Sequence, residues 1–232
     1  MIKLFRHIRQ SLIEQNDMGK YLKYAIGEIL LVVIGILIAL GINNWNEERK
    51  ARRIEIVLLE KLQEENQINL EEIQSDSIYR DNLPELITSF NTFLRTSDLE
   101  IHKDSLRNYL SDIMRSTSYS FTQSNLINYV NSHRSSASNI TRELATLQGF
   151  QDDLQTVTEK GIDIKLSNFY NVIKDDVDFS TLDIENYDKF KSLNFRNDIL
   201  ILLSLESEIS FQFNKTLRQI RLVDSLITDK LK

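Results

Sequence analysis

Cysteine is absent from the 232-residue sequence, proline occurs once, and glycine occurs only six times. Without cysteine there are no disulfide bonds, no thiol nucleophile and no thiolate metal ligands. Turns in all-β proteins need many glycine and proline residues, so their scarcity predicts long helices. The expected fold is all-α, with a short amphipathic N-terminal helix, one transmembrane helix that continues into a long soluble helix, and then a helical bundle.

The sequence also lacks the motifs of common catalytic and nucleotide-binding sites. No GxSxG, SxxK, HExxH, GxGxxG or GxxxxGK[ST] pattern occurs, and six scattered glycines cannot build a phosphate-binding loop. The three histidines, His7, His102 and His133, are widely separated, which favours surface or capping positions over a metal site. We therefore expect no enzyme activity, no catalytic residue, no cofactor and no metal.

Acidic side chains outnumber basic ones, and the formal net charge is −6. Residues 1–50 hold seven basic and five acidic side chains, which leaves 21 basic and 29 acidic side chains for the remainder. A domain with this charge balance repels the phosphates of nucleic acids. Nucleic acid is therefore not an expected partner.

One apolar run dominates the sequence. Ala25–Ile42 contains eighteen residues with a single charge, at Glu28, and a helix of ~20 apolar residues crosses the hydrocarbon core of a membrane. The run lies too far from the start, without a small-residue cleavage site after it, to be a cleavable signal peptide. We predict a transmembrane helix over residues 20–45. Its interfacial anchors are expected at Lys20, Tyr21, Lys23, Tyr24 and Trp45.

Residues 1–19 precede the span and are expected to lie on the membrane surface. Over residues 2–14, apolar and basic side chains fall on opposite faces of a helix, as in helices that bind anionic lipid. A plain charged tail is the alternative.

Four residues of the span are candidate functional positions. Glu28 is an acid inside a membrane segment, which suggests an ion path or a partner's counter-charge, but its place near one end favours an interfacial carboxylate. Gly27, Gly35 and Ala39 recur at multiples of four residues. Small residues at this spacing let two helices approach closely. The alternative is that small residues are simply common in membrane spans.

Basic residues flank the span on both sides, so the orientation depends on their positions. Lys20 and Lys23 adjoin the span, whereas Arg49, Lys50, Arg52 and Arg53 follow it. We predict a cytoplasmic N-terminus and an extracytoplasmic helical-bundle domain over residues 46–232. The basic cluster after the span could hold lipid headgroups. A solvated face is favoured, because Glu48 and Glu55 lie at helical spacing from Arg52.

Residues Lys20–Lys50, KYLKYAIGEILLVVIGILIALGINNWNEERK, follow IKLFRHIRQSL. Together they resemble the N-terminal signature GKYxKYAIGEIxLVVIGILIALxINNWNE of an uncharacterised single-pass membrane protein family of Bacteroidota. The STSYSF and SNLINYVNS segments resemble that family more weakly, and the glycine expected after the second is absent. The family has no assigned activity, so the resemblance implies no catalytic residues. It implies a Gram-negative inner-membrane location and a domain of unknown function.

The remaining chain is expected to alternate long helices with polar loops. After the continuation of the span to about Ser77, helices are predicted over Asn82–Arg95, with Pro84 in the first turn, from Asp104 or Ser105 to Met114, near Leu126–Val130, over Ile140–Asp175 and over Leu193–Leu231. Apolar residues of the last helix recur at alternating intervals of three and four, which is typical of bundle or coiled-coil packing. Asn66 and Asn69 interrupt the apolar stripe of the first soluble helix, either to fix register or as partly exposed residues. Asp175–Asp188 is expected to be an acidic loop without an EF-hand pattern.

These observations favour an inner-membrane interaction or scaffold protein, whose expected partners are the lipid bilayer and either a second copy or another membrane protein. The alternative is an extracytoplasmic sensory or ligand-binding helical module that signals through a partner. An accessory to an ion pathway, acting through Glu28, is a third possibility.

Overall fold

The computed structural model describes residues 18–134 and 138–232, and of Met18, Lys20 and Tyr21 it describes only the backbone. Nearly all of the predicted surface segment over residues 1–19 therefore lies outside the described residues. The chain divides into two units, Met1–Val57 and Leu58–Lys232.

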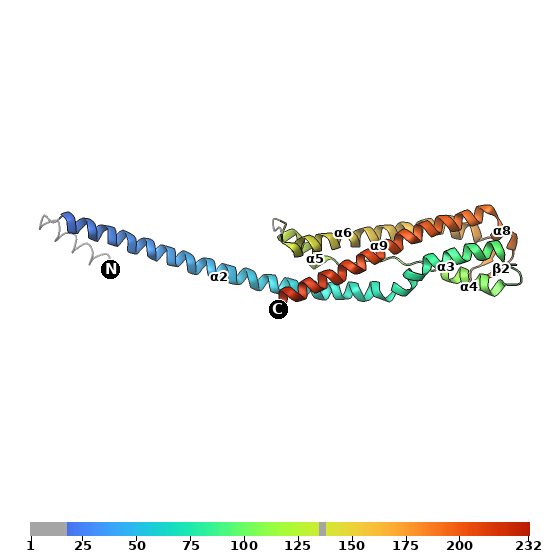
Figure 1. Ribbon diagram of the computed structural model, residues 1–232, viewed down its shortest axis with the longest axis horizontal. Coiled ribbons are helices and arrows are strands. Elements are labelled where there is room, and N and C mark those ends of the chain that lie inside the picture. Colours follow the sequence, from blue (N-terminus) through green and yellow to red (C-terminus); the bar gives the residue numbers. More distant parts are fainter. Residues whose placement is uncertain (1–17, 135–137) are drawn as a thin grey trace. The chain divides into compact units, whose positions relative to one another are not determined.

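The fold is all-α, as predicted (Figure 1), and the described residues include one small β-hairpin. The helices are α2 (Met18–Ser75), α3 (Ser77–Thr96), α4 (Lys103–Met114), α5 (Ser124–Ser132), α6 (Asn139–Ile164), the π-helix η1 (Lys165–Tyr170), α7 (Asn171–Ile173), α8 (Tyr187–Lys191) and α9 (Leu193–Leu231). Strands β1 (Val177–Asp178) and β2 (Asp183–Ile184) pair antiparallel.

In the first unit, α2 carries the apolar run. Among the described residues there is one helix long and apolar enough to cross a membrane, and its most apolar window has a mean hydropathy of 2.8 with no residue buried. Apolar side chains on every side of an unburied helix are typical of a membrane span. The prediction that the helix continues beyond the span is confirmed, because α2 ends only at Ser75.

The second unit is organised around buried residues that alternate at intervals of three and four on its long helices. This spacing keeps one face of a helix inside a bundle. Figure 1 shows α6 and α9 side by side, and α9 also packs against α3. On α9 the buried series is Ile199, Leu202, Glu206, Ile209, Phe213, Thr216, Ile220, Val223 and Ile227.

The same spacing runs through the junction of α2 and α3. The buried series there is Leu59, Leu62, Asn66, Asn69, Ile73, Asp76, Arg80, Leu83, Ile87, Phe90 and Leu94. Polar residues therefore occupy inward-facing positions of these helices. Two of them, Asp76 and Arg80, fall where the apolar core is divided into two clusters, one containing Ile73 and Phe213 and the other containing Leu83 and Leu202.

The predicted helix start at Asn82–Pro84 is wrong. Helix α3 begins at Ser77 and holds Pro84 in its interior. A proline at this position leaves the carbonyl of Arg80, four residues earlier, without its helical N–H donor. The hydroxyl of Ser210 on α9 donates to that carbonyl at 2.8 Å, so a tertiary hydrogen bond replaces the missing helical one.

The predicted single helix over Ile140–Asp175 is also wrong in its second part. Helix α6 ends at Ile164 and passes into the π-helix η1 and the short α7. The segment predicted as an acidic loop contains the β1–β2 hairpin, in which Leu182 has a positive φ of 56°. Tertiary packing of this end of the bundle overrides the simple helical period of the sequence.

Asn66 and Asn69 are buried, which decides between their two interpretations. Asn66 Nδ2 donates to the carbonyl of Ile220 at 3.0 Å. Asn69 donates to the carbonyl of Thr122 at 2.8 Å and accepts from the N–H of the same residue at 3.0 Å. Both asparagines thus hold α2 in a fixed register against neighbouring segments.

Candidate functional site

The most unusual site in the bundle is a layer of three buried charges, which we call the charge layer: Arg80 on α3, Lys165 on η1 and Glu206 on α9. The Glu206 carboxylate lies 2.8 Å from Arg80 Nη1 and 2.8 Å from Lys165 Nζ. All three side chains are no more than 4% exposed. Charged residues are rarely buried to this extent, and when they are, they need partners.

Further polar groups complete the hydrogen bonding of the layer. Arg80 Nε donates to the hydroxyl of Tyr119 at 3.1 Å, and Arg80 Nη2 donates to the Thr117 carbonyl at 3.1 Å and to its hydroxyl. Tyr119 in turn donates to Asp76 at 3.1 Å. The charge layer therefore fixes the segment between α4 and α5 against α3.

A third cation, Arg115, closes the same network at its edge. Lys165 Nζ donates to the backbone carbonyl of Arg115 at 2.9 Å, and the Arg115 guanidinium pairs with Asp76. That guanidinium also lies over the ring of Tyr79, 4.2 Å from its centre. Asp76 lies between the end of α2 and the start of α3, and Arg80 follows it by one turn. The network is therefore anchored where α2 meets α3.

Burial sets the direction in which the pKa values of Lys165, Tyr79 and Tyr119 shift. Burial lowers the pKa of Lys165, and the Glu206 carboxylate opposes that change. Burial raises the pKa of the Tyr79 hydroxyl, with the Glu206 carboxylate acting in the same direction, and it also raises the pKa of the Tyr119 hydroxyl, against the nearby Arg80. Both tyrosines are therefore neutral hydrogen-bond donors in the physiological range.

The space beside the charge layer is very small. A cavity of about 10 Å³, lined by Arg80, Gly161, Lys165 and Glu206 among others, has room for about one water molecule. Such a cavity cannot hold a substrate, so the arrangement suits a structural role. Buried ion pairs contribute little net stability, but removing one partner is costly, which makes them suited to fixing which helices meet and in what register.

A larger pocket lies next to the network on the surface of the bundle. It has a volume of about 360 Å³ and combines the apolar Ile78, Leu83 and Leu86 with the polar edge of Tyr79 and Arg115. The Tyr79 hydroxyl donates to the carbonyls of Asp112 and Arg115 at 3.2 and 3.0 Å. A bound molecule at this pocket would touch groups that belong to the charge-layer network.

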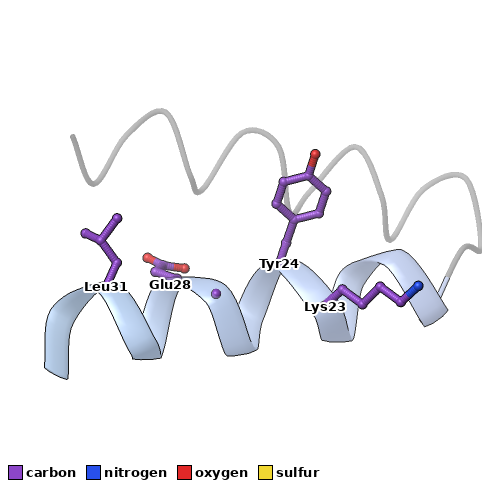
Figure 2. Close-up of a pocket in the computed structure, with 5 residues that line it drawn as sticks. Lys23, Tyr24, Glu28 and Leu31 are labelled. Atoms are coloured by element: carbon purple, nitrogen blue, oxygen red, sulfur yellow. The ribbon is translucent and has the colours of Figure 1, made fainter. Parts of the chain in front are cut away.

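In the first unit, four residues singled out from the sequence line one pocket. The pocket has a volume of about 290 Å³ and is lined by Lys23, Tyr24, Gly27 and Glu28 together with Leu31. Figure 2 shows Tyr24, Glu28 and Leu31 on the same side of α2. Glu28 thus lies in the first turns of the predicted span and lines the same pocket as Lys23 and Tyr24.

The other predicted span residues lie farther along α2 or outside the description. A Cβ added at Gly27 or Gly35 would meet no atom of the described chain within 4 Å, and Ala39 is exposed. Trp45 is 62% exposed. The side chains of Lys20 and Tyr21 lie outside the described residues.

The predicted residues do not include any member of the charge layer. A signal was nevertheless present, because Glu206 lies four residues after Leu202 and three before Ile209. A charged residue at an inward position of a helical period indicates a buried polar contact. No sequence rule identifies its partners, since they come from two other helices.

Metal ligands are not gathered in the described part of the chain, where no group of three or more histidine, aspartate or glutamate side chains could hold a metal ion. His102 precedes α4 and His133 follows α5. His133 stacks on Tyr129 with ring centres 4.1 Å apart, and His7 lies outside the described residues.

Comparison with known proteins gives one positive result. The profile of DUF6090, described as a family of unknown function, matches residues 28–148. The matched region includes most of the span, α3, α4, α5 and the start of α6, and it contains Arg80 but not Lys165 or Glu206. No curated protein and no solved structure matches the chain.

Proposed function

We propose a non-enzymatic role for this chain, which belongs to the DUF6090 family of unknown function. In this role it is an interaction or scaffold protein of the inner membrane. The chain would cross the membrane once, with its N-terminus in the cytoplasm and its helical domain outside it. The resemblance of its N-terminal signature to a family of Bacteroidota supports a Gram-negative inner membrane.

The observation that carries the proposal is the length of α2. One helix includes the apolar, unburied segment and the first core residues of the bundle, Leu59 and Leu62. No loop separates the two in the chain. A helix shared in this way suits a protein that presents a folded surface to partners near the membrane.

The charge layer supports a structural role for the bundle. Its interior space is sufficient for about one water molecule, and its three charges satisfy one another. Such a layer favours one arrangement of helices over others. Coiled-coil-like pairing of α6 with α9 is part of the proposal, since both carry buried residues at intervals of three and four.

Self-association through the span is the first form of the proposal to test. Gly35 and Ala39 lie on one face of α2, together with Glu28 seven residues before Gly35, and the space over Gly35 is open. Gly41 lies about 120° away around the helix, at 100° per residue.

Full-length wild type, Gly35→Leu and Gly41→Leu should be compared by crosslinking in membranes. We expect Gly35→Leu to reduce the crosslinked dimer severalfold and Gly41→Leu to leave it unchanged. Equal dimer in all three would refute self-association through this face.

The topology has its own test. A reporter that is active only in the periplasm, fused after Lys232, should be active in cells. A silent fusion, with the same reporter active on a known periplasmic protein, contradicts the proposed orientation.

A sensory or ligand-binding module is the second candidate, and one observation favours it. The pocket of about 360 Å³ beside Tyr79 and Arg115 adjoins the charge-layer network, so a ligand there could alter the Arg115–Asp76 pair. A thermal-shift screen of the full chain against metabolites tests this role. A true ligand should raise the melting temperature of wild type but not that of Ile78→Trp, whose larger side chain fills the pocket. If no compound raises the melting temperature of wild type alone, the sensory role loses its support.

A further inference from the structure

A pocket on α2 lies just beyond the apolar run and combines charges of both signs. It has a volume of about 220 Å³ and is lined by Trp45, Glu48, Arg49 and Arg52. The intervals of three and four residues place these side chains on one face of the helix. The Arg49 guanidinium carbon lies 5.8 Å from the centre of the Trp45 ring, which orients the guanidinium beside the exposed indole.

The position of this pocket matches the headgroup layer of a membrane, and this inference rests on the proposed transmembrane location. Ile29–Asn46 is a stretch of eighteen uncharged residues, about 27 Å of helix, and tryptophan is enriched where hydrocarbon meets headgroups. Arg49 and Arg52 follow Trp45 by about 6 and 10 Å along the helix axis. The headgroups extend about 5–8 Å beyond the core on each side, so Arg49 lies at the height of the phospholipid phosphates. Arg52 lies about one turn farther out, and its long side chain can reach back toward them.

The charges of the pocket remain separate from one another. Glu48 and Arg52 are four residues apart, a spacing that commonly forms an ion pair, yet among the residues that the structure describes these two form none. The neighbouring cation Lys50 pairs with Glu47 at 3.1 Å, and neither residue lines the pocket. The pocket therefore presents two guanidinium groups and one carboxylate to the same bound group.

We infer that this pocket binds the headgroup of an aminophospholipid, phosphatidylethanolamine, through both of its charges. Arg49 and Arg52 donate to the phosphate, for which guanidinium groups are the best-matched side chains. Glu48 accepts from the primary ammonium, which has three N–H donors. A quaternary choline lacks those donors, and phosphatidylglycerol has no positive group to pair with the carboxylate. Trp45 holds the acyl boundary at the correct depth.

Native mass spectrometry of the detergent-solubilised full chain tests this assignment. The protein is mixed with phosphatidylethanolamine, phosphatidylglycerol and phosphatidylcholine of identical acyl chains, and the lipid retained on the chain is counted. Wild type should retain phosphatidylethanolamine with about fivefold preference over either competitor, the effect of one partly exposed ion pair. Glu48→Gln should remove the preference while phosphatidylglycerol is still retained.

A matched pair of double variants separates a built pocket from general basic charge. Arg49→Gln/Arg52→Gln removes two positive charges from the pocket and should lower phospholipid retention about tenfold. Lys50→Gln/Arg53→Gln removes two positive charges outside it and should leave retention unchanged. Equal losses in the two variants, or stronger retention of phosphatidylglycerol than of phosphatidylethanolamine by wild type, would overturn the assignment.

Vesicle flotation distinguishes failure of this inference from failure of the proposed function. If all variants float with vesicles but show no lipid preference, the span stands and the headgroup pocket is wrong. If wild type itself does not float, the transmembrane location is wrong, and the headgroup assignment falls with it.

Discussion

Replacing Glu206 by glutamine should strongly destabilise the bundle, because it leaves two buried cations without their shared carboxylate. Wild-type Glu206 lies 2.8 Å from a nitrogen of Arg80 and 2.8 Å from Lys165 Nζ. At an effective dielectric constant of about 20, a pair of opposite charges ~4 Å apart is worth about 4 kcal/mol, so the two pairs amount to about 8 kcal/mol. Desolvation of the three charges offsets a large part of this attraction.

The expected net loss follows from measurements on other buried pairs. Removing one partner of a buried ion pair costs about 3–5 kcal/mol, mainly because the remaining charge stays buried and unpaired. In a domain of this size each kcal/mol lowers the melting temperature by about 2–4 °C. Glu206→Gln should therefore lower the free energy of unfolding by about 3–5 kcal/mol and the melting temperature by about 6–20 °C.

Denaturant unfolding of the full chain in detergent micelles, followed by far-ultraviolet circular dichroism, measures this loss. The control is Asp229→Asn on the same helix, whose ion pair with Lys232 is exposed. That substitution should change stability by no more than about 0.5 kcal/mol.

A second substitution tests whether the destabilisation arises from the unpaired cations. Lys165→Met removes one of the two positive charges. In the Glu206→Gln background it should recover at least about 1 kcal/mol, which a double-mutant cycle detects as coupling between the two positions. A loss below about 1 kcal/mol for Glu206→Gln, or no recovery in the double variant, would refute the electrostatic reasoning.

Three further predictions use the same unfolding measurement. Gly149→Ala, in open space on α6, should stabilise the bundle by up to about 1 kcal/mol. Gly161→Ala should be about 1–3 kcal/mol less stable than Gly149→Ala, because its Cβ would meet an isoleucine methyl at 2.8 Å. Equal stabilities of the two variants would show that the packing at Gly161 adjusts freely. Ser210→Ala should cost about 1–3 kcal/mol, because it leaves the Arg80 carbonyl without a donor. Adding Pro84→Ala should restore part of the loss by supplying the missing helical N–H. If the effects of the two substitutions simply add, this link is contradicted. Because burial raises the pKa of Tyr79 in the folded state, deprotonation of the unfolded state should reduce wild-type stability as the pH rises above about 10, and a Tyr79→Phe variant with the same slope would disprove this contribution.

The sequence by itself determined the fold class and several helices. The last helix was predicted over Leu193–Leu231 and is found with those bounds, because an uninterrupted apolar period without proline or glycine specifies a helix locally. The apolar run likewise identified the one described helix able to cross a membrane. Both are properties of contiguous residues, which sequence reasoning reads directly.

Local rules failed where distant residues supply what a segment lacks. Pro84 indicated a helix start, but Ser210 donates to the carbonyl that the proline leaves without a donor, so the helix continues through it. Asn66 and Asn69 had two equal interpretations from sequence, and their hydrogen bonds to Ile220 and Thr122 decided for buried contacts. In each case the deciding partner lies more than 50 residues away in the chain.

The charge layer is the feature that only the tertiary structure decided. Glu206 could be recognised as a charge at an inward position of α9, but its cations are brought to it by α3 and η1. Burying such charges is unfavourable for each residue alone and acceptable only when all three meet. A single sequence states the charges and their periods, whereas the pairing depends on how three helices pack in space.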